Sequence, residues 1–296
     1  MELHPLHPAR WVLDQLRRHD WHIQDLLAFT RSSTLVLAHR DGEEPVVVKA
    51  GFGSNHVLAA MPEHDRPAAY GFYWYQQMSP AERTMARSDF RHERDLAREC
   101  TGAAHMVPLL AEGHCEDFDW YTMPHYPDGN FATLMAATGT EPSALAGQLS
   151  ILADIAEGLA ELHSRGVVHR DVYQENILID HGRGLITDLG AARRLHTPHG
   201  PRYRGPEVHW PPEYLTDYQT AGPAADVFSL AVLTHRVLLG DIPRLAVPPS
   251  FASIPDPLTT ALPSALSHTP ADRPSMTEFR NALQRAAIRA TTAKTP

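Results

Sequence analysis

The sequence predicts an α+β fold with two lobes, a small N-terminal lobe built on a β-sheet and a larger, mostly helical C-terminal lobe. The chain has 296 residues, more than a single compact unit usually contains. Strand-like apolar segments separated by turn signals fill its first part, and long segments with apolar residues at helical spacing fill its second part. We expect the lobes at residues 21–126 and 127–290, with an N-terminal extension at 1–20 and a tail at 291–296.

The composition excludes several classes of protein. The net charge is −9 and no basic block stands out, so a nucleic-acid partner is not expected. No apolar run approaches the roughly 18 residues of a membrane span, and the first residues lack the features of a signal peptide, so we expect a cytoplasmic protein without a membrane partner. Cys100 and Cys115 are predicted to be reduced thiols. The sequence does not indicate the oligomeric state.

The N-terminal lobe is expected to begin with three antiparallel strands. A short amphipathic helix is predicted near residues 8–18. The stretch "LLAFTRSSTLVLAHRDGEEPVVVKAG" then gives apolar strands broken by a polar turn and by the hairpin signal Asp41-Gly42. Residues 51–78 form an insertion with the aromatic run "YGFYWYQQM". This run either covers the lobe's own sheet, which we favour, or offers a docking face for a partner.

One helix and two further strands complete this lobe. Ser79, Pro80 and Glu82 form a capping box with proline at the first helical position, which predicts a helix from there toward Cys100. The stretches "HMVPLLAEG" and "FDWYTMPHY" follow as two strands. Residues 124–130 are expected to connect the lobes.

The C-terminal lobe is predicted to be helical. Apolar residues at helical spacing predict a helix from about residue 142, and the almost wholly apolar stretch "ADVFSLAVLTHRVLLG" predicts a buried one. Residues 241–263 are rich in proline and are expected to form a loop. The amphipathic stretch "SMTEFRNALQRAAIRA" closes the chain as a helix.

Polar residues with phosphate and metal chemistry occur at the ends of short apolar segments. "HRDVYQENIL" carries Asp171 and Asn176, and "ITDLG" carries Asp188. Carboxylate and amide oxygens placed in this way can hold Mg²⁺ against phosphates. Far upstream, Lys49 ends an apolar strand and Glu93 lies on the predicted helix. A lysine that faces the interior needs a carboxylate or a phosphate to stay charged there.

At these residues the sequence resembles the eukaryotic-type protein kinases, over residues 26–283 and with the motifs in the family's order. "VVVK" resembles the third-strand lysine motif, which implies that Lys49 holds the ATP phosphates, paired with Glu93. "HRDVYQEN" resembles the catalytic loop, which implies that Asp171 accepts or orients the proton of the acceptor hydroxyl and that Asn176 holds magnesium. "DLG" resembles the DFG motif and gives Asp188 a second metal contact.

Three structural anchors extend the resemblance. "PPE" resembles the end of the activation segment, so that Glu213 would pair with Arg273 of "ADRPSM". Asp226 in "ADVFSL" resembles the buried aspartate that braces the catalytic loop. Small-molecule kinases of the aminoglycoside and choline types generally lack this activation segment and its arginine, so these residues favour the protein-kinase branch.

The predicted ATP pocket departs from the family in its phosphate loop. "AFTRSSTLVL" contains no glycine, so Ser32, Ser33 and Thr34 would have to bind the phosphates through their hydroxyls. The alternative is an ordinary polar turn. Met123 is expected to border the adenine, and His125 in the connector offers backbone groups to the base.

The acceptor side also departs from the family. Tyr173 stands where serine/threonine kinases usually carry a lysine, and Pro206 stands where they carry a threonine that contacts this lysine. Thr197 is our candidate phosphorylation site, which Arg170 would anchor. Four further arginines of the segment are candidates for the missing charge or are solvated loop residues: Arg193, Arg194, Arg202 and Arg204.

The sequence therefore predicts an ATP- and Mg²⁺-dependent protein kinase. Serine or threonine is the expected acceptor, because "HRDVYQEN" lacks the Ala-Arg pattern typical of tyrosine kinases. Two alternatives stay open. One is a pseudokinase that binds or scaffolds partners, and the other is a kinase of a small-molecule or otherwise unusual acceptor. The protein substrate is not identified by the sequence.

Overall fold

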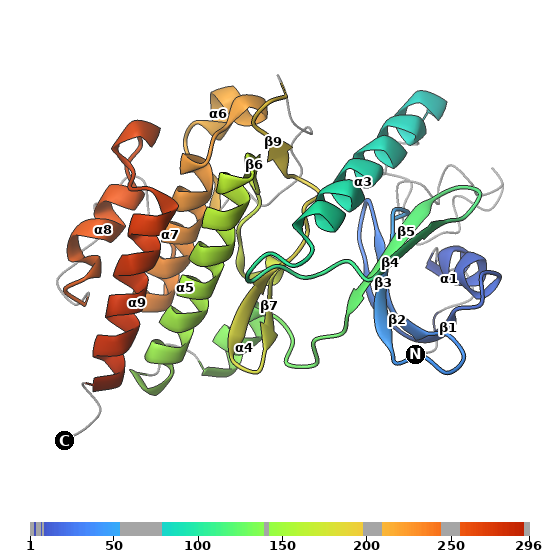
Figure 1. The fold of residues 1–296 in the computed structure, drawn as a ribbon, viewed down its shortest axis with the longest axis horizontal. Coiled ribbons are helices and arrows are strands. Elements are labelled where there is room, and N and C mark those ends of the chain that lie inside the picture. The colour runs from blue at the N-terminus through green and yellow to red at the C-terminus, as the bar shows by residue number, and fades with distance from the viewer. Residues whose placement is uncertain are drawn as a thin grey trace. The chain divides into compact units, whose positions relative to one another are not determined.

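The predicted α+β fold is confirmed by the computed structural model (Figure 1). The structure describes residues 3, 7, 9–53, 79–138, 142–197, 209–243 and 255–292. The chain divides into two compact units. Unit 1 comprises Met1–Thr101 and Pro108–His125, and unit 2 comprises Gly102–Val107 and Tyr126–Pro296. Unit 1 holds a five-stranded sheet, and unit 2 is mostly helical.

The sheet of unit 1 has the strand order β1-β2-β3-β5-β4, and all neighbours are antiparallel. Its strands are β1 (His22–Phe29), β2 (Thr34–His39), β3 (Val46–Ala50), β4 (Ala111–His114) and β5 (Asp119–Pro124). Gly42 lies at φ +78° in the turn between β2 and β3, as expected for the predicted hairpin. The strand expected from "HMVPLLAEG" begins only at Ala111, because Met106 and Val107 pair with Ile186 of unit 2 instead.

Each face of this sheet is packed against one helix. α1 (Ala9–Arg17) buries an apolar stripe in a cluster that includes Val36, Val48 and Trp120. Trp11 of α1 packs on Phe52 with ring centroids 4.6 Å apart. The helix therefore belongs to the core of unit 1.

The other helix is α3 (Pro80–Cys100), whose predicted N-terminal capping box is confirmed. The Ser79 hydroxyl accepts from the Glu82 N–H at 3.3 Å, and the Glu82 carboxylate accepts from the Ser79 N–H at 2.6 Å. These bonds satisfy backbone donors that the first turn of a helix leaves unpaired. α3 begins and ends where the sequence predicts.

Unit 2 is built around α5, which packs along α9 and also contacts α7. Its helices are α4 (Phe131–Thr138), α5 (Pro142–Ser164), α6 (Tyr214–Asp217), α7 (Ala224–Leu239), α8 (Leu258–Ala265) and α9 (Met276–Thr292). Two small antiparallel pairs accompany them. They are β6 (Val167–Val168) with β9 (Arg193–Arg194), and β7 (Ile177–Asp180) with β8 (Arg183–Ile186). The stretch predicted as a buried helix is α7, which is buried along most of its length.

The prediction of a loop over residues 241–263 is wrong at its end, where α8 begins. Leu258, Leu262 and Ala265 are all buried at helical spacing, and this apolar stripe outweighs the proline inside the helix, Pro263. The aromatic run at residues 70–75 lies outside the described residues, as do Arg202, Arg204 and Pro206. Within the described part of the chain, every helix is too short or too polar to cross a bilayer.

Candidate functional site

The predicted site residues fall into two groups, one in each unit. In unit 1, Lys49 of β3 lies opposite Tyr121 of β5 in the strand register. Lys49 Nζ donates to Glu93 Oε1 at 2.6 Å, and the Tyr121 hydroxyl donates to the same oxygen at 2.7 Å. The three residues are 4%, 6% and 4% exposed. Charges this deeply buried persist only when both are paired and hydrogen-bonded, as they are here.

The composition gives a second signal at Lys49, independent of its motif. Among the 26 lysines and arginines, lysine occurs only at Lys49 and Lys294. All the remaining positions of this set are arginine. Lysine at the end of β3 therefore departs from the chain's general preference for arginine. A compact ammonium fits a buried strand position where the planar fork of arginine needs several acceptors.

The turn between β1 and β2, where the ATP phosphates were expected, is held by its own hydrogen bonds. The Thr30 hydroxyl contacts both the carbonyl and the hydroxyl of Ser33 at 3.1 Å. Ser33 and Thr34 are both buried, and the Thr34 hydroxyl donates to the Phe52 carbonyl at 2.5 Å. Of the three predicted phosphate-binding residues, only Ser32 is exposed.

A glycine that lies outside the turn supports it. A Cβ atom at Gly53 would come within 2.5 Å of the Thr30 carbonyl oxygen and 2.6 Å of the Arg31 carbonyl oxygen. Only glycine permits this close approach of two backbone segments. The other residues predicted for the ATP pocket lie at the end of β5, where Met123 is buried and His125 is exposed.

In unit 2 a single buried carboxylate supports the predicted catalytic loop. Asp226, at the start of α7, accepts the backbone N–H groups of His169 at 2.9 Å and Arg170 at 2.7 Å. His163 Nε2 lies 2.8 Å from the same carboxylate. Burial alone would raise the pKa of Asp226, but the hydrogen bond and charge of His163, the charge of His169 and the Arg170 N–H outweigh it and lower the pKa. Asp226 is therefore ionised and braces the loop.

The same loop brings Asp171 and Asn176 into contact. Asn176 Nδ2 donates to the carbonyl and the carboxylate of Asp171 at 3.0 and 3.1 Å. The Asn176 carbonyl accepts the N–H of Thr187 at 3.0 Å, so Asp188 follows directly after a residue bonded to the loop. With both amide hydrogens bonded to Asp171, the Asn176 Oδ1 atom is the oxygen that can accept a cation.

Two residues of this region have left-handed backbones. Arg170 lies at φ +68° and Asp188 at φ +64°, although neither is glycine. The Asp188 carboxylate accepts the Gly190 N–H at 3.1 Å, which stabilises its turn. Backbone strain of this kind occurs preferentially at functional sites, where surrounding contacts offset its cost.

The predicted anchor pair is also in contact. Arg273 Nη1 and Nη2 donate to the two carboxylate oxygens of Glu213 at 2.6 and 2.8 Å. Further bonds run from Arg273 to the carbonyls of Ala224 and Ser267, both at 2.9 Å, and its guanidinium lies 4.8 Å from the Phe228 ring. This bidentate pair ties residue 213 to the helical core.

Two arginines of unit 2, Arg193 and Arg170, bind backbone carbonyls. Arg193 donates to the carbonyls of Thr220 at 2.7 Å and Thr197 at 2.9 Å, and the Thr197 hydroxyl donates to the Arg194 carbonyl at 2.7 Å. Arg170 donates to the carbonyl of Tyr218 at 2.8 Å and lies 4.3 Å from its ring. Burial lowers the pKa of Arg170. The predicted role of Thr197 as a phosphorylation site stays a prediction.

His209 is a residue near the site that the sequence analysis missed. Its ring centroid lies 6.2 Å from that of Tyr173. The imidazole is 4% exposed, and within the described part of the chain neither ring nitrogen has a hydrogen-bond partner. Burial, and next the charge of Arg236, lower its pKa to about 4. Its position beside "PPE" carries no periodic or motif signal, so only the fold places it beside Tyr173.

Comparison with known proteins identifies one family. The model of the protein kinase domain matches residues 76–250. Serine/threonine-protein kinase pim-2 of Danio rerio is 29% identical over 191 residues, which cover 61% of this chain and 56% of the relative. PkaB of Streptomyces coelicolor, also named a serine/threonine-protein kinase, is 33% identical over 153 residues, 42% of this chain and 36% of that protein.

A third relative, serine/threonine-protein kinase Pkn1 of Myxococcus xanthus, is 31% identical over 191 residues. The match covers 55% of this chain and 27% of the relative. The chain thus spans between about a quarter and just over half of the length of these three proteins.

Proposed function

The chain belongs to the protein kinase domain family, and on this premise we propose that it transfers the γ-phosphate of ATP to a serine or threonine hydroxyl of a protein. The contact of Asp171 with Asn176, braced from below by ionised Asp226, supports this proposal most directly. This loop presents a carboxylate and an amide oxygen in fixed positions, and phosphoryl transfer requires side chains of these two kinds.

The donor set fits Mg²⁺. The Asp188 carboxylate and Asn176 Oδ1 are hard oxygen donors, and Mg²⁺ in kinases is bound by one or two protein groups together with phosphate oxygens and water. When bound, the ion neutralises charge on the phosphates. Among the described residues, no cluster of three or more histidine, cysteine or acidic side chains suits a metal. Two protein oxygens are enough for Mg²⁺ when phosphate oxygens and water complete the ligands, so Asp188 and Asn176 would hold the ion jointly with the nucleotide.

Four protein groups act on the acceptor hydroxyl and on the phosphates in this scheme. Asp171 accepts or orients the proton of the acceptor hydroxyl, and Asn176 fixes its carboxylate through the 3.1 Å hydrogen bond. Lys49 holds the phosphates, and Glu93 keeps the lysine charged and directed. Serine or threonine is the proposed acceptor because the loop lacks the tyrosine-kinase pattern and because the three relatives are named serine/threonine kinases.

The experiment compares the wild type with Asp171→Asn, using labelled ATP, Mg²⁺ and a generic protein substrate. We expect the wild type to label the protein and the variant to lose this activity by about 10²–10⁴-fold, the usual contribution of such a group. MgATP should raise the Tm of both proteins. Asp180→Asn is the matched control, since Asp180 pairs with Arg183 on the β7–β8 hairpin. Equal silence of wild type and Asp171→Asn, with no thermal shift, would refute the proposal.

One observation favours the alternative of an unusual acceptor. The position of the usual lysine is filled by Tyr173, whose ring lies against the buried ring of His209, so an uncharged aromatic pair stands where a cation is expected. Transfer of label only to low-molecular-weight compounds would support this alternative. Nucleotide binding without any transfer would identify a pseudokinase.

A further inference from the structure

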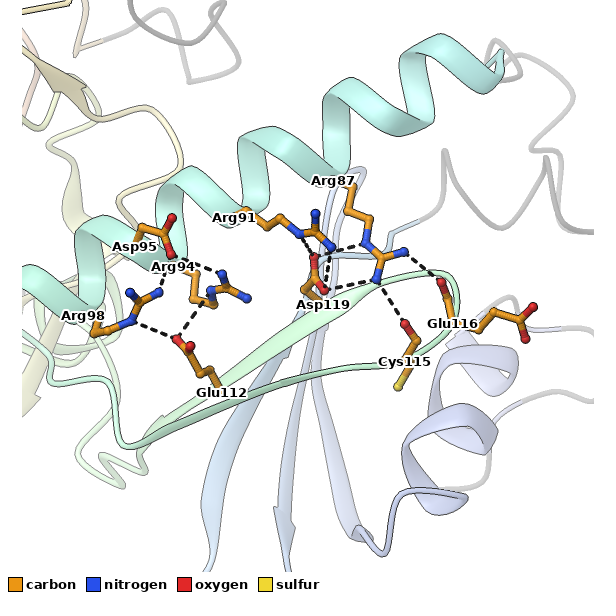
Figure 2. Close-up of polar contacts among 9 residues, drawn as sticks. All are labelled: Arg87, Arg91, Arg94, Asp95, Arg98, Glu112, Cys115, Glu116 and Asp119. Carbon is orange, nitrogen blue, oxygen red and sulfur yellow. Dashed lines mark hydrogen bonds and ion pairs between the residues drawn. The ribbon is translucent and has the colours of Figure 1, made fainter.

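A row of arginines along α3 binds the β4–β5 hairpin of unit 1 (Figure 2). Arg87, Arg91, Arg94 and Arg98 recur at helical spacing, so their side chains leave the helix on one side. Figure 2 shows Arg87 and Arg91 converging on Asp119, and Arg94 and Arg98 reaching Glu112. The row thus contacts the hairpin at two points, on either side of Glu93 in the sequence.

Asp119 is the buried centre of the first contact. Its carboxylate, 2% exposed, accepts Arg87 Nε and Nη2 at 3.1 Å each and Arg91 Nε at 2.6 Å. Burial would raise the pKa of Asp119, but the hydrogen bonds of Arg87 and Arg91 outweigh it and lower the pKa. Arg87 also donates to the carbonyls of Glu116 at 2.8 Å and Cys115 at 3.1 Å. One carboxylate therefore joins two turns of α3 to the hairpin.

The second contact is more exposed. Arg98 Nε donates to the Glu112 carboxylate at 3.0 Å, Arg94 Nε lies 3.5 Å from it, and both arginines contact Asp95. The Glu112 side chain is 38% exposed. Ion pairs at this level of exposure contribute little to stability, whereas a buried carboxylate depends on its partners. Asp119 is therefore the stronger of the two attachments.

Asp119 is connected to the Lys49–Glu93 pair through β5. Asp119 and Tyr121 lie two residues apart and so face the same side of the strand, and the Tyr121 hydroxyl binds Glu93. The Phe90 ring stacks on Tyr121 at 5.6 Å. The carbonyl of Asp119 also accepts the N–H of Gly51, two residues after Lys49. A shift of α3 away from Asp119 would therefore move Glu93 away from Lys49.

We propose that Asp119, through Arg87 and Arg91, is a positioning residue that fixes α3 so that Glu93 stays bonded to Lys49. The contacts that support this ion pair all come from side chains of unit 1. An effect of Asp119 on turnover would rest on the proposed kinase function. Its effect on the position of Lys49 does not, and that position can be measured without any kinase activity.

The test uses the scarcity of lysine. Because lysine occurs only at positions 49 and 294, acetylation by acetic anhydride, followed by mass spectrometry of the peptides, reports on Lys49 with Lys294 as an internal standard. Asp119→Asn should raise the acetylation rate of Lys49 several-fold relative to Lys294, because a buried, paired ammonium reacts slowly and a released one does not. Arg91→Gln, which leaves Arg87 on Asp119, should give a smaller rise and serves if Asp119→Asn does not fold.

A double-mutant comparison separates positioning from general destabilisation. Glu93→Gln should also raise the acetylation of Lys49, and adding Asp119→Asn to it should raise the rate no further, since both act through one contact. Val36→Ala removes buried volume on the α1 side of the sheet and should lower the Tm without raising the Lys49 rate. Glu112→Gln should leave the rate unchanged.

The outcomes of the two proposals are distinguishable. A folded Asp119→Asn protein whose Lys49 reacts at the wild-type rate, or a rate equally raised by Val36→Ala, overturns the positioning role while leaving the kinase proposal intact. If the wild type transfers no phosphate but Asp119→Asn still exposes Lys49, the kinase proposal fails and the positioning role stands. In an active wild type, Asp119→Asn should lower kcat several-fold with an unchanged KM for the protein acceptor.

Discussion

The two units fix their functional groups by different means. In unit 1, Glu93 is held by side chains, namely Lys49 and Tyr121 directly and the arginines of α3 through Asp119. In unit 2, the loop that carries Asp171 is held by backbone N–H groups that converge on one carboxylate, Asp226. In unit 1, several ion pairs and hydrogen bonds share the stabilisation of Glu93. In unit 2, the position of the loop depends on the carboxylate of one residue, Asp226.

This difference teaches where each unit is vulnerable. A buried N–H group that loses its acceptor is costly to leave unpaired, particularly at Arg170, where the backbone is already strained. In unit 1, the loss of one donor leaves others on the same carboxylate. We therefore expect the loss of the Asp226 carboxylate in unit 2 to cost more than the loss of one donor to Glu93 in unit 1.

The largest effect is expected for Asp226→Ala in unit 2. Removal of this carboxylate leaves the N–H groups of His169 and Arg170 and the ring of His163 without their acceptor, and should lower the free energy of unfolding by about 3–5 kcal/mol. Urea denaturation measures the loss. Asp217→Ala, an exposed aspartate of the same unit, is the control and should cost far less. If Asp226→Ala lowered the free energy of unfolding by less than Tyr121→Phe does, unit 1 and not unit 2 would be the more vulnerable unit.

The next effect is a pH dependence that His209 contributes to unit 2. Its folded pKa of about 4 lies below the ordinary value of about 6.5, so the unfolded chain binds the proton first. The contribution of neutral His209 to the free energy of unfolding is fully present above pH 6.5. It falls as the pH is lowered toward 4, by about 3 kcal/mol in total. His209→Phe should remove this part of the wild-type decrease, as followed by urea unfolding at several pH values.

The control for this prediction is a buried residue of the same unit without a titratable group. Val237→Ala should lower the free energy of unfolding at every pH and leave its pH dependence as it is in the wild type. An identical decrease in wild type and His209→Phe would show that His209 is not protonated on unfolding in this range.

The smallest effect is expected in unit 1, for Tyr121→Phe. The change removes one hydrogen bond to the Glu93 carboxylate, which keeps its bond to Lys49, so the cost should be about 2 kcal/mol. Thermal and urea unfolding measure it. If the free energy of unfolding fell by several kcal/mol, the ion pair would depend on this one hydroxyl. Unit 1 would then rely on a single residue, as unit 2 does.

Local signals in the sequence predicted most of the fold. The capping box set the start of α3, and the Asp41-Gly42 turn set the hairpin between β2 and β3. Lys49 and Glu93 were singled out from motif order, and the structure places their charged atoms 2.6 Å apart. Their roles in catalysis stay predictions, as do those of Asp171, Asn176 and Asp188.

Features that depend on tertiary contacts were not predictable in the same way. The arginine spacing on α3 is visible in the sequence, but its partner Asp119 is defined only by which face of β5 meets the helix. α8 formed across Pro263 because the packing of Leu258 and Leu262 outweighed a local helix breaker. His209 meets Tyr173 only because chain segments distant in sequence fold together.

The turn between β1 and β2 has a consequence for protein engineering. Grafting glycines onto positions 32 and 33 alone would not produce a loose loop, because the Thr34 hydroxyl and the close fit of Gly53 against Thr30 would still pin the backbone from outside the graft. A change that loosens this turn must also break the hydrogen bond of Thr34 to the Phe52 carbonyl, because the turn stays packed against residues 52 and 53. The design unit for altering the shape of this turn is therefore the turn together with the segment that follows β3.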